Sequence, residues 1–218
     1  MAVVTQDRAY GWATQADYTT AKTPGSNAFK KLIVTDNNFI DHQVATQNDD
    51  GFSHGYNTPT DQWTESHDNS VSHTLPGFIE ELPKPFKLVL GGYAVTTPDG
   101  GTTAKSHKIT PLSPAVSRQL QAVSYIEKVG AHDIMAPSML GESLSLQGND
   151  QGLLMCDLSL RGSGEVKDSG VTWGSHVDVL TGFHKVFNTQ MKLELDNGSD
   201  APYEIGCNYR AFNLSVQN

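Results

Sequence analysis

Apolar and polar residues alternate one by one over residues 141–164, and the rest of the chain is organised around this stretch. Leu144 and Leu146 lie on one face of its first arm, and Leu158 and Leu160 lie on one face of its second arm, with serines and charged residues between them. Because successive side chains of a strand point to opposite faces, each arm has an apolar side and a polar side. The Gly- and Asn-rich segment between the arms suits a turn. The pattern predicts an antiparallel hairpin whose apolar face packs on a second layer.

The remaining elements follow from the same reading. Further strands are predicted at 29–40, 106–112, 117–129 and 189–196, with a return strand after the Asn197-Gly198 turn. One short helix is predicted within 76–92, where an apolar stripe follows Pro83 and Pro85 and Gly91-Gly92 ends it. Residues 93–105 and 165–188 are rich in turn-forming residues, so we expect loops there.

These elements predict a mainly β fold, an antiparallel β-sandwich or barrel with one short flanking α-helix and long loops. We expect residues 1–28 to form an N-terminal arm and a first strand. Residues 29–218 then form a single β-sandwich domain with a long inserted loop at 41–75. The length of 218 residues fits one such domain, and 20 glycines with 37% hydrophobic residues favour short strands and turns.

The polar segment 41–75 carries three aromatic residues, Phe52, Tyr56 and Trp63. A loop of this length inside a compact domain is uncommon and points to function or disorder. Exposed rings are typical of docking surfaces. We therefore expect an extended loop or ribbon that docks on a neighbouring subunit. A small aromatic cluster within the same subunit is the equally weighted alternative.

Charge and cysteine content narrow the function classes. The net charge of −9 is spread along the chain without an acidic tail, which argues against a nucleic-acid grip. Cys156 and Cys207 both occupy apolar strand positions, which favours two buried thiols over a disulfide. The chain has no apolar run of bilayer length. Its first 20 residues lack a secretion signal, so we expect it to be made in the cytoplasm.

The chain carries no catalytic motif that we recognise, so we expect a protein that is not an enzyme and binds no cofactor. Histidines and acids of the 41–75 segment are a metal-site candidate, but their spacing matches no standard zinc or calcium pattern. His132-Asp133 is either a turn or, less favoured, a general base. Asp157 and Arg161 are a candidate cross-strand ion pair.

A run of features in the middle of the chain resembles the major tail tube proteins of long-tailed bacteriophages. The run comprises an apolar helix with a small-residue stop (FKLVLGG, 86–92), a Thr/Gly/Pro loop (TTPDGGTTAKSH, 96–107), an extended segment (KITPLSPAVSRQLQAVSYI, 108–126) and a Ser/Leu-alternating hairpin (LSLQGN…LLMCDLSLRGSGE, 144–165). The opening GWATQADYTTAKTP (11–24) is similar to the family's N-terminal segment more loosely. The resemblance covers about the middle two fifths of the chain, and residues 165–218 match less closely.

The resemblance implies a subunit that assembles as hexameric rings. Such rings stack into a hollow tail tube, through which the phage genome passes into the host. The implied partners are further copies of the chain, the other tail proteins (tape measure, tail terminator and distal tail protein) and transiently the phage DNA, with no membrane. The implied location is the virion tail, after synthesis in the host bacterial cytoplasm.

Within this picture, the polar face of the hairpin is the candidate lumen surface. Its residues are Ser143, Ser145, Asp157, Ser159 and Arg161. A hydroxyl-rich, net acidic lining repels phosphate and lets DNA slide. Phe52, Tyr56 and Trp63 are the candidate subunit interface. The competing class is a stand-alone β-sandwich that binds carbohydrate or acts as an adhesin, in which Trp12, Trp63 and Trp173 stack on sugars.

Overall fold

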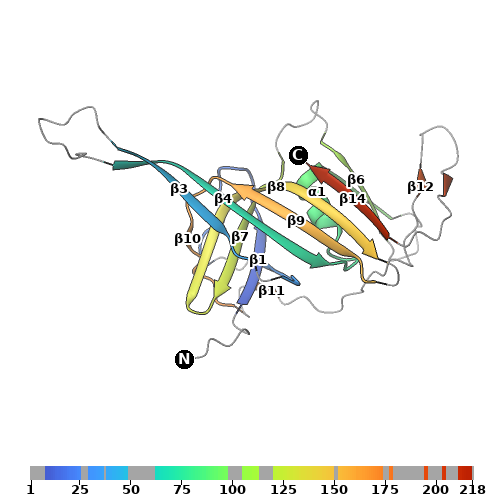
Figure 1. Cartoon of the computed structure of the whole chain (residues 1–218), viewed down its shortest axis with the longest axis horizontal. Coiled ribbons are helices and arrows are strands. Elements are labelled where there is room, and N and C mark those ends of the chain that lie inside the picture. Colours follow the sequence, from blue (N-terminus) through green and yellow to red (C-terminus); the bar gives the residue numbers. More distant parts are fainter. Residues whose placement is uncertain are drawn as a thin grey trace, which may run out of the picture.

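The computed structural model of the chain describes residues 8–25, 29–36, 38–48, 62–97, 105–112, 120–149, 152–173, 177–178, 194–195, 203–204 and 211–217. Its strands are β1 (Arg8–Thr14), β2 (Phe29–Leu32), β3 (Asp41–Asn48), β4 (Gln62–Pro76), β5 (Gly91–Thr96), β6 (Ser106–Pro111), β7 (Val123–Val129), β8 (His132–Asn149), β9 (Met155–Gly162), β10 (Lys167–Asp168), β11 (Val177–Asp178), β12 (Glu194–Leu195), β13 (Tyr203–Glu204) and β14 (Ala211–Gln217). The helix of the described part is α1 (Pro83–Leu90) (Figure 1). The predicted mainly β fold with one short helix is therefore confirmed.

Most of the strands belong to one ten-stranded sheet with the order β11-β2-β1-β7-β8-β9-β4-β3. β10 and β14 leave this path and pair with β8. Strands β5 and β6 form a separate antiparallel hairpin, and β12 pairs with β13. Apart from the parallel pair β11 and β2, the described pairings are antiparallel.

The 18-residue strand β8 joins two halves of this sheet. Along one edge, residues 132–139 of β8 pair with β7 and residues 143–149 pair with β14. Along the other edge, residues 134–135 pair with β10 and residues 139–147 pair with β9. Ser138 adopts a positive φ of 59°, and the register with β9 shifts between Gly141 and Ser143. A bulge of this kind bends a strand. We call β1, β2 and β7 the scaffold half, and β14, residues 143–149 of β8, β9, β4 and β3 the open half.

The two halves pack face to face around the main core. Its buried side chains come from β1, β2, β7, the β4–β9 pair, β8 and α1. Tyr10, Trp12 and Tyr125 of the scaffold half belong to the same cluster as Leu144 and Leu158 of the open half. The two halves therefore form the layers of a sandwich, as the apolar face of the hairpin requires.

A second, smaller cluster covers the far face of the scaffold half. It contains Ala13, Phe29, Ile126, Met135 and Val171. The scaffold half is thus buried on both sides. This explains why residues 123–127 of β7 are buried without interruption, whereas β9 alternates between buried and partly exposed positions.

Helix α1 sits on β8 at a point where only glycine fits. A Cβ atom at Gly141 would lie 2.8 Å from a methyl of Val89 and 2.9 Å from the backbone of Leu88. The helix begins at Pro83, so Pro83 and Pro85 lie within its first turn and not before it. In the first turn the missing N–H of proline costs nothing, because these N–H groups have no partner within the helix. It ends at Gly91, whose φ of 83° glycine adopts without strain, as the sequence predicted.

Within 41–75 the described residues form two strands and not a loop. β3 and β4 pair as a long antiparallel ribbon, and β4 continues along β9 into the sandwich. The alternation was hidden because two polar residues, Asn69 and His73, occupy core-facing positions together with Val71 and Leu75. A polar residue in such a position removes the apolar signal without removing the strand.

Several other boundaries differ from the prediction. The strand expected at 29–40 ends at Leu32, and the loop expected at 93–105 begins instead with strand β5. β7 begins at Val123. His132 and Asp133 open β8, because the turn falls one step earlier at Gly130 and Ala131.

The C-terminal predictions are only partly covered. Of the strand expected at 189–196, the structure describes Glu194 and Leu195, which pair with β13. Cys156 is a buried free thiol, and burial raises its pKa to about 12. Cys207 and the turn at Asn197-Gly198 lie outside the described residues.

Candidate functional site

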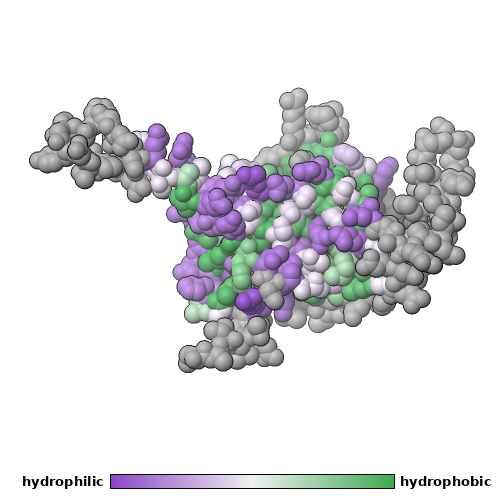
Figure 2. All heavy atoms as spheres, in the orientation of Figure 1, coloured by the Kyte–Doolittle hydropathy of each residue, from purple (hydrophilic) through white to green (hydrophobic). Residues whose placement is uncertain are grey.

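The solvent side of the open half is a polar sheet face. The five hairpin residues predicted to line a lumen all lie on it, and β4 and β14 extend it on either side. We call this surface the polar face, and its residues are Ser72, Thr74, Ser143, Ser145, Gln147, Asp157, Ser159, Arg161, Asp68 and Asn213. Figure 2 shows hydrophilic and apolar residues interspersed on the side of the molecule that it presents.

Hydrogen bonds between neighbouring strands establish that these side chains share one face. The Ser72 and Ser159 hydroxyls are 2.7 Å apart. Thr74 donates to Asp157 at 2.7 Å, and Gln147 donates to the other oxygen of the same carboxylate at 2.6 Å. Register places Ser145 beside Asp157. The result is a continuous network of short polar side chains across β4, β9 and β8.

The strongest charge contact on the polar face joins Arg161 and Asp68. The guanidinium donates to both carboxylate oxygens, at 3.0 and 2.7 Å, and Glu142 lies 3.8 Å away. These contacts lower the pKa of Asp68 and raise that of Arg161. The predicted pairing of Arg161 with Asp157 is wrong, because both residues belong to β9 and Asp157 is held by Thr74 and Gln147. Asp68 balances the charge of Arg161, and Asp157 leaves the polar face with a net negative charge.

Both outer strands of the open half have an edge without a partner strand among the described residues. β14 pairs with β8 alone, and β3 pairs with β4 alone. Each carries an exposed apolar residue: Leu214 is 48% exposed and Val44 is 44% exposed. Leu214 pairs with core-facing Leu146, and Val44 pairs with His67, two positions before core-facing Asn69. The apolar side of the sheet therefore continues to both open edges without cover.

Of the three predicted interface aromatics, the structure describes Trp63. It lies on β4 opposite Gln47, and it is 46% exposed. Phe52 and Tyr56 lie outside the described residues. An exposed indole on an edge ribbon is available for a contact with another molecule.

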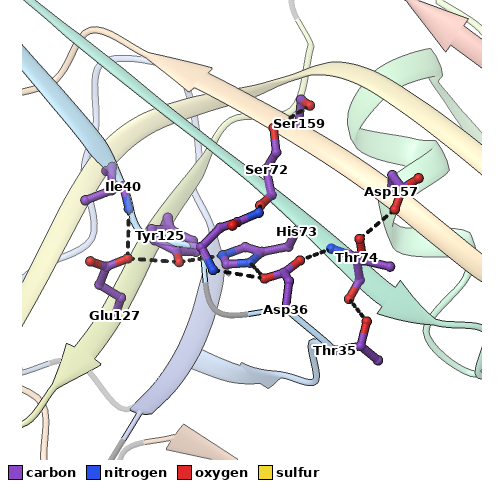
Figure 3. A network of polar contacts seen from close by, with 11 residues as sticks. Thr35, Asp36, Ile40, Ser72, His73, Thr74, Tyr125, Glu127, Asp157 and Ser159 are labelled. Carbon is purple, nitrogen blue, oxygen red and sulfur yellow. Dashed lines mark hydrogen bonds and ion pairs between the residues drawn. The ribbon is translucent and has the colours of Figure 1, made fainter. Parts of the chain in front are cut away.

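Behind the polar face, a buried polar network links the layers of the sandwich (Figure 3). The His73 ring contacts Asp36 at 2.8 Å through Nδ1 and the Tyr125 hydroxyl at 2.7 Å through Nε2. Tyr125 donates to Glu127 at 3.2 Å, and Glu127 also accepts from the backbone N–H of Ile40 at 3.1 Å. The other Asp36 oxygen accepts from the backbone N–H of Thr74. The network thus fixes the segment between β2 and β3 against β4 and β7.

Burial sets the protonation preferences in this network. It lowers the pKa of His73, although Asp36 works in the opposite direction, and it raises the pKa values of Glu127 and Tyr125. An Asp-His-Tyr chain can in principle move a proton. His73 and Tyr125 are only 3% and 1% exposed, however, so a substrate cannot reach either of them. We therefore assign the network to structure and not to catalysis.

The remaining candidates for chemistry have structural partners. Asp133 accepts a hydrogen bond from the Trp173 indole at 2.8 Å, so it holds a loop against β8. Among the described residues, no group of three or more His, Cys, Asp or Glu could hold a metal ion. His42 and His67 stack on each other with ring centroids 5.4 Å apart, and His42 also contacts Asn69.

Comparisons with known proteins add no family assignment. No protein-family model matches the chain, and no curated protein is significantly similar to it. Within the described residues, no helix is both long enough and apolar enough to cross a membrane.

Proposed function

We propose that this chain is a structural virion protein that polymerises as stacked hexameric rings into a phage tail tube, a conduit for the genome. In this proposal the polar face lines the lumen, and DNA passes over it without specific contacts. The partners are other copies of the chain and the remaining tail proteins, namely tape measure, tail terminator and distal tail protein. The role is structural and not enzymatic, and it needs no cofactor.

The observation that carries the proposal is a polar face bounded by two open edges. Unpaired edges of a sheet are sites for pairing with another chain, and closing a ring removes them. β3 has eight residues and β14 has seven, so they match in length. Pairing β14 of one copy with β3 of the next is a head-to-tail contact, which closes into a ring when the rotation fits.

The exposed apolar residues on the two edges support the same contact. Leu214 and Val44 lie on the core side of their strands, at opposite ends of the open half. Edge-to-edge pairing would bring them onto one continuous apolar surface and remove both from water. The polar face would then continue across the junction on the other side of the sheet.

The chemistry of the polar face suits a channel for DNA. Its serine and threonine hydroxyls bond to each other and to Asp157, and Arg161 is engaged by Asp68. A polyanion meets a net acidic surface with no unmatched cation among these residues. Phosphates are repelled and not held. The sequence resemblance to tail tube proteins points to the same role.

The alternative hypothesis, a sugar-binding module, needs exposed tryptophans that stack on sugar rings. Trp12 is 5% exposed and belongs to the main core. Trp173 packs against the second cluster and donates to Asp133. Only Trp63, of the three tryptophans, is exposed, and one ring does not form a stacking surface for a glycan chain.

The test follows assembly of the purified chain across a concentration series, by negative-stain microscopy and light scattering. Wild-type protein should form rings or tubes. Val44→Lys or Leu214→Lys should leave a folded monomer, because each places a charge at the edge contact. Ile79→Lys is the matched control, since Ile79 is 58% exposed but lies outside both edge strands. A wild-type chain that stays monomeric at every concentration would refute the proposal.

A separate variant tests the interface aromatics. Asn48 and Gln62 face each other across the ribbon, so residues 49–61 can be replaced by the two-residue turn Asn-Gly. This change removes Phe52 and Tyr56 and keeps Trp63. We expect a folded chain that no longer forms tubes, and tubes from this variant would exclude a docking role for Phe52 and Tyr56.

A further inference from the structure

Four polar side chains form one row of hydrogen bonds that links the two halves of the sheet. Asp36 contacts His73 at 2.8 Å, and the other ring nitrogen of His73 contacts the Tyr125 hydroxyl at 2.7 Å. That hydroxyl lies 3.2 Å from an oxygen of Glu127 (Figure 3). We call these four residues the buried row. No water fits within contacts this short, so each of the three contacts needs a hydrogen from its own two members.

The buried row is one hydrogen short when both carboxyls are ionised and the histidine is neutral. A neutral imidazole and a tyrosine hydroxyl bring one hydrogen each, and carboxylates bring none. Two hydrogens cannot fill three contacts, so one contact would place two lone pairs against each other. The geometry therefore requires one additional proton, carried by Asp36, His73 or Glu127.

Burial places this proton on Glu127, which is only 4% exposed. A proton on His73 would put an imidazolium between two carboxylates, which makes three charges where a protonated Glu127 leaves one. Asp36 is the better site for that one charge, because its side chain is 18% exposed and its other oxygen accepts the backbone N–H of Thr74. Burial also raises the pKa of Glu127 and lowers the pKa of His73.

A protonated Glu127 satisfies every contact of the buried row. With an ionised Glu127, Tyr125 donates to it and has no hydrogen left for His73. With a protonated Glu127, the carboxyl O–H donates to Tyr125, and Tyr125 in turn donates to Nε2 of His73. The Nδ1–H of His73 then donates to Asp36. The same Glu127 oxygen still accepts from the backbone N–H of Ile40 at 3.1 Å, since a carboxyl oxygen that donates keeps acceptor capacity.

The groups that face Glu127 within the described part of the chain supply no counter-charge in place of the proton. Strand register puts Tyr10 of β1 on one side of it and the uncharged Ile134 of β8 on the other. Arg8 and His132 belong to the next cross-strand positions. Arg8 lies over an exposed phenylalanine ring, 4.5 Å from its centroid, and His132 is exposed to solvent. From the opposite layer, the ionisable groups are those of the buried row itself.

We infer that Glu127 holds a buried proton at neutral pH, which closes a polar latch between the two layers of the sandwich. Without this proton, Tyr125 turns toward the Glu127 carboxylate, and its oxygen then faces the unprotonated Nε2 of His73. The latch loses its central contact, and a second carboxylate is left buried. Raising the pH therefore loosens the hold of β7 on β4 and on the segment with Asp36, which joins β2 to β3. The latch belongs to each subunit alone and does not require that copies associate.

Glu127→Gln tests the proton directly, because the amide donates to Tyr125 and accepts from Ile40 without titrating. The pKa of Glu127 is raised above its unfolded value of about 4.3, so folding takes up a proton and wild-type stability falls as the pH rises between the two values. Measured by urea unfolding, the unfolding constant of wild type relative to Glu127→Gln should rise about tenfold or more from pH 5 to pH 7. Glu165→Gln is the control: it makes the same charge change at an exposed position and should follow wild type.

NMR of the wild-type chain gives a readout that needs no variant. At pH 7 we expect one glutamate side-chain carboxyl with the ¹³C shift of a neutral acid, and a neutral His73 ring with its hydrogen on Nδ1. An ionised Glu127 at pH 7, a doubly protonated His73, or a ratio of unfolding constants that does not change with pH would overturn the inference. None of these outcomes bears on the formation of rings or tubes, so the proposed function stands or falls separately.

Discussion

The scaffold half and the open half of the sheet share the main core, but the face that points away from this core is buried in the scaffold half and exposed to solvent in the open half. In β7, five consecutive residues from Val123 to Glu127 are buried, because clusters cover both sides. In β9, buried residues alternate with partly exposed ones, because one side meets the core and the other forms the polar face. The scaffold half is therefore buried on both faces, and the open half has one solvent-exposed polar face and, among the described residues, two unpaired edges.

Placing one charge in each half tests this difference most severely. Ser124 of β7 is fully buried and accepts hydrogen bonds from Gln15 and from the backbone N–H of Lys22, whereas Ser159 of β9 contacts Ser72 on the polar face. Ser124→Asp should lower the free energy of unfolding by about 3–5 kcal/mol, because it places a charge and extra volume at a fully buried position. Ser159→Asp should cost less than about 1 kcal/mol. Urea unfolding of both variants measures this, and equal losses would contradict the comparison.

The buried network should respond to removal of its central ring. His73→Ala leaves Asp36 and the Tyr125 hydroxyl without their partner, which should cost about 2–3 kcal/mol at pH 7. His107→Ala is the control, because His107 lies on an exposed strand and contacts Tyr93. Equal unfolding midpoints for the two variants would show that the network contributes no stability.

The same variant carries a pH signature. The pKa of His73 is lowered in the folded state, so protonation below its unfolded value of about 6.5 favours the unfolded chain. The stability difference between wild type and His73→Ala should therefore narrow as the pH falls from 7 to 5. The raised pKa of Glu127 acts in the opposite direction and is common to both chains. A difference that widens on acidification would contradict the assignment.

Gly141 tests how closely the helix is fitted to the open half. Gly141→Ala places a Cβ against the backbone of Leu88, which must shift, so we expect a loss of about 1–3 kcal/mol. Gly130→Ala separates this clash from the effect of backbone conformation, because Gly130 has a positive φ but open space around it. Thermal unfolding of both variants measures the two effects, and Gly141→Ala should lower the unfolding temperature more than Gly130→Ala. A Gly141→Ala variant that unfolds at the wild-type temperature would mean that α1 is not closely packed on β8.

The smallest effect is expected on the polar face itself. Arg161→Ala removes an exposed ion pair with Asp68, which contributes little to stability in water. The urea midpoint should not change measurably, while the pKa of Asp68, followed by NMR, should rise toward its usual value. A large loss of stability would place Arg161 among the residues that hold the fold.

The elements that could be predicted from the sequence are those whose buried positions are occupied by apolar residues. The alternation of Leu144, Leu146, Leu158 and Leu160 specified the central hairpin, and the glycine after Leu90 specified the end of the helix. The β3–β4 ribbon was missed because its core-facing positions include Asn69 and His73. Their burial depends on partners at distant positions, such as Asp36 and Tyr125, which no local pattern encodes.

Part of the candidate site could also be predicted from the sequence. The period of two placed Ser143, Ser145, Asp157, Ser159 and Arg161 on one face. The strand register and the hydrogen bonds of this face show that they share it. The Arg161–Asp68 pair could not be predicted, because it joins segments that lie far apart in the chain. Such contacts are set by strand order, which a single sequence does not reveal.

Electron cryomicroscopy of the concentrated, purified chain tests the central claim most directly. The proposal predicts closed rings or hollow tubes in which β14 of each subunit pairs with β3 of the next, with Ser145 and Ser159 lining the lumen. A map in which these serines face outward, or preparations that contain single subunits at every concentration, would contradict it.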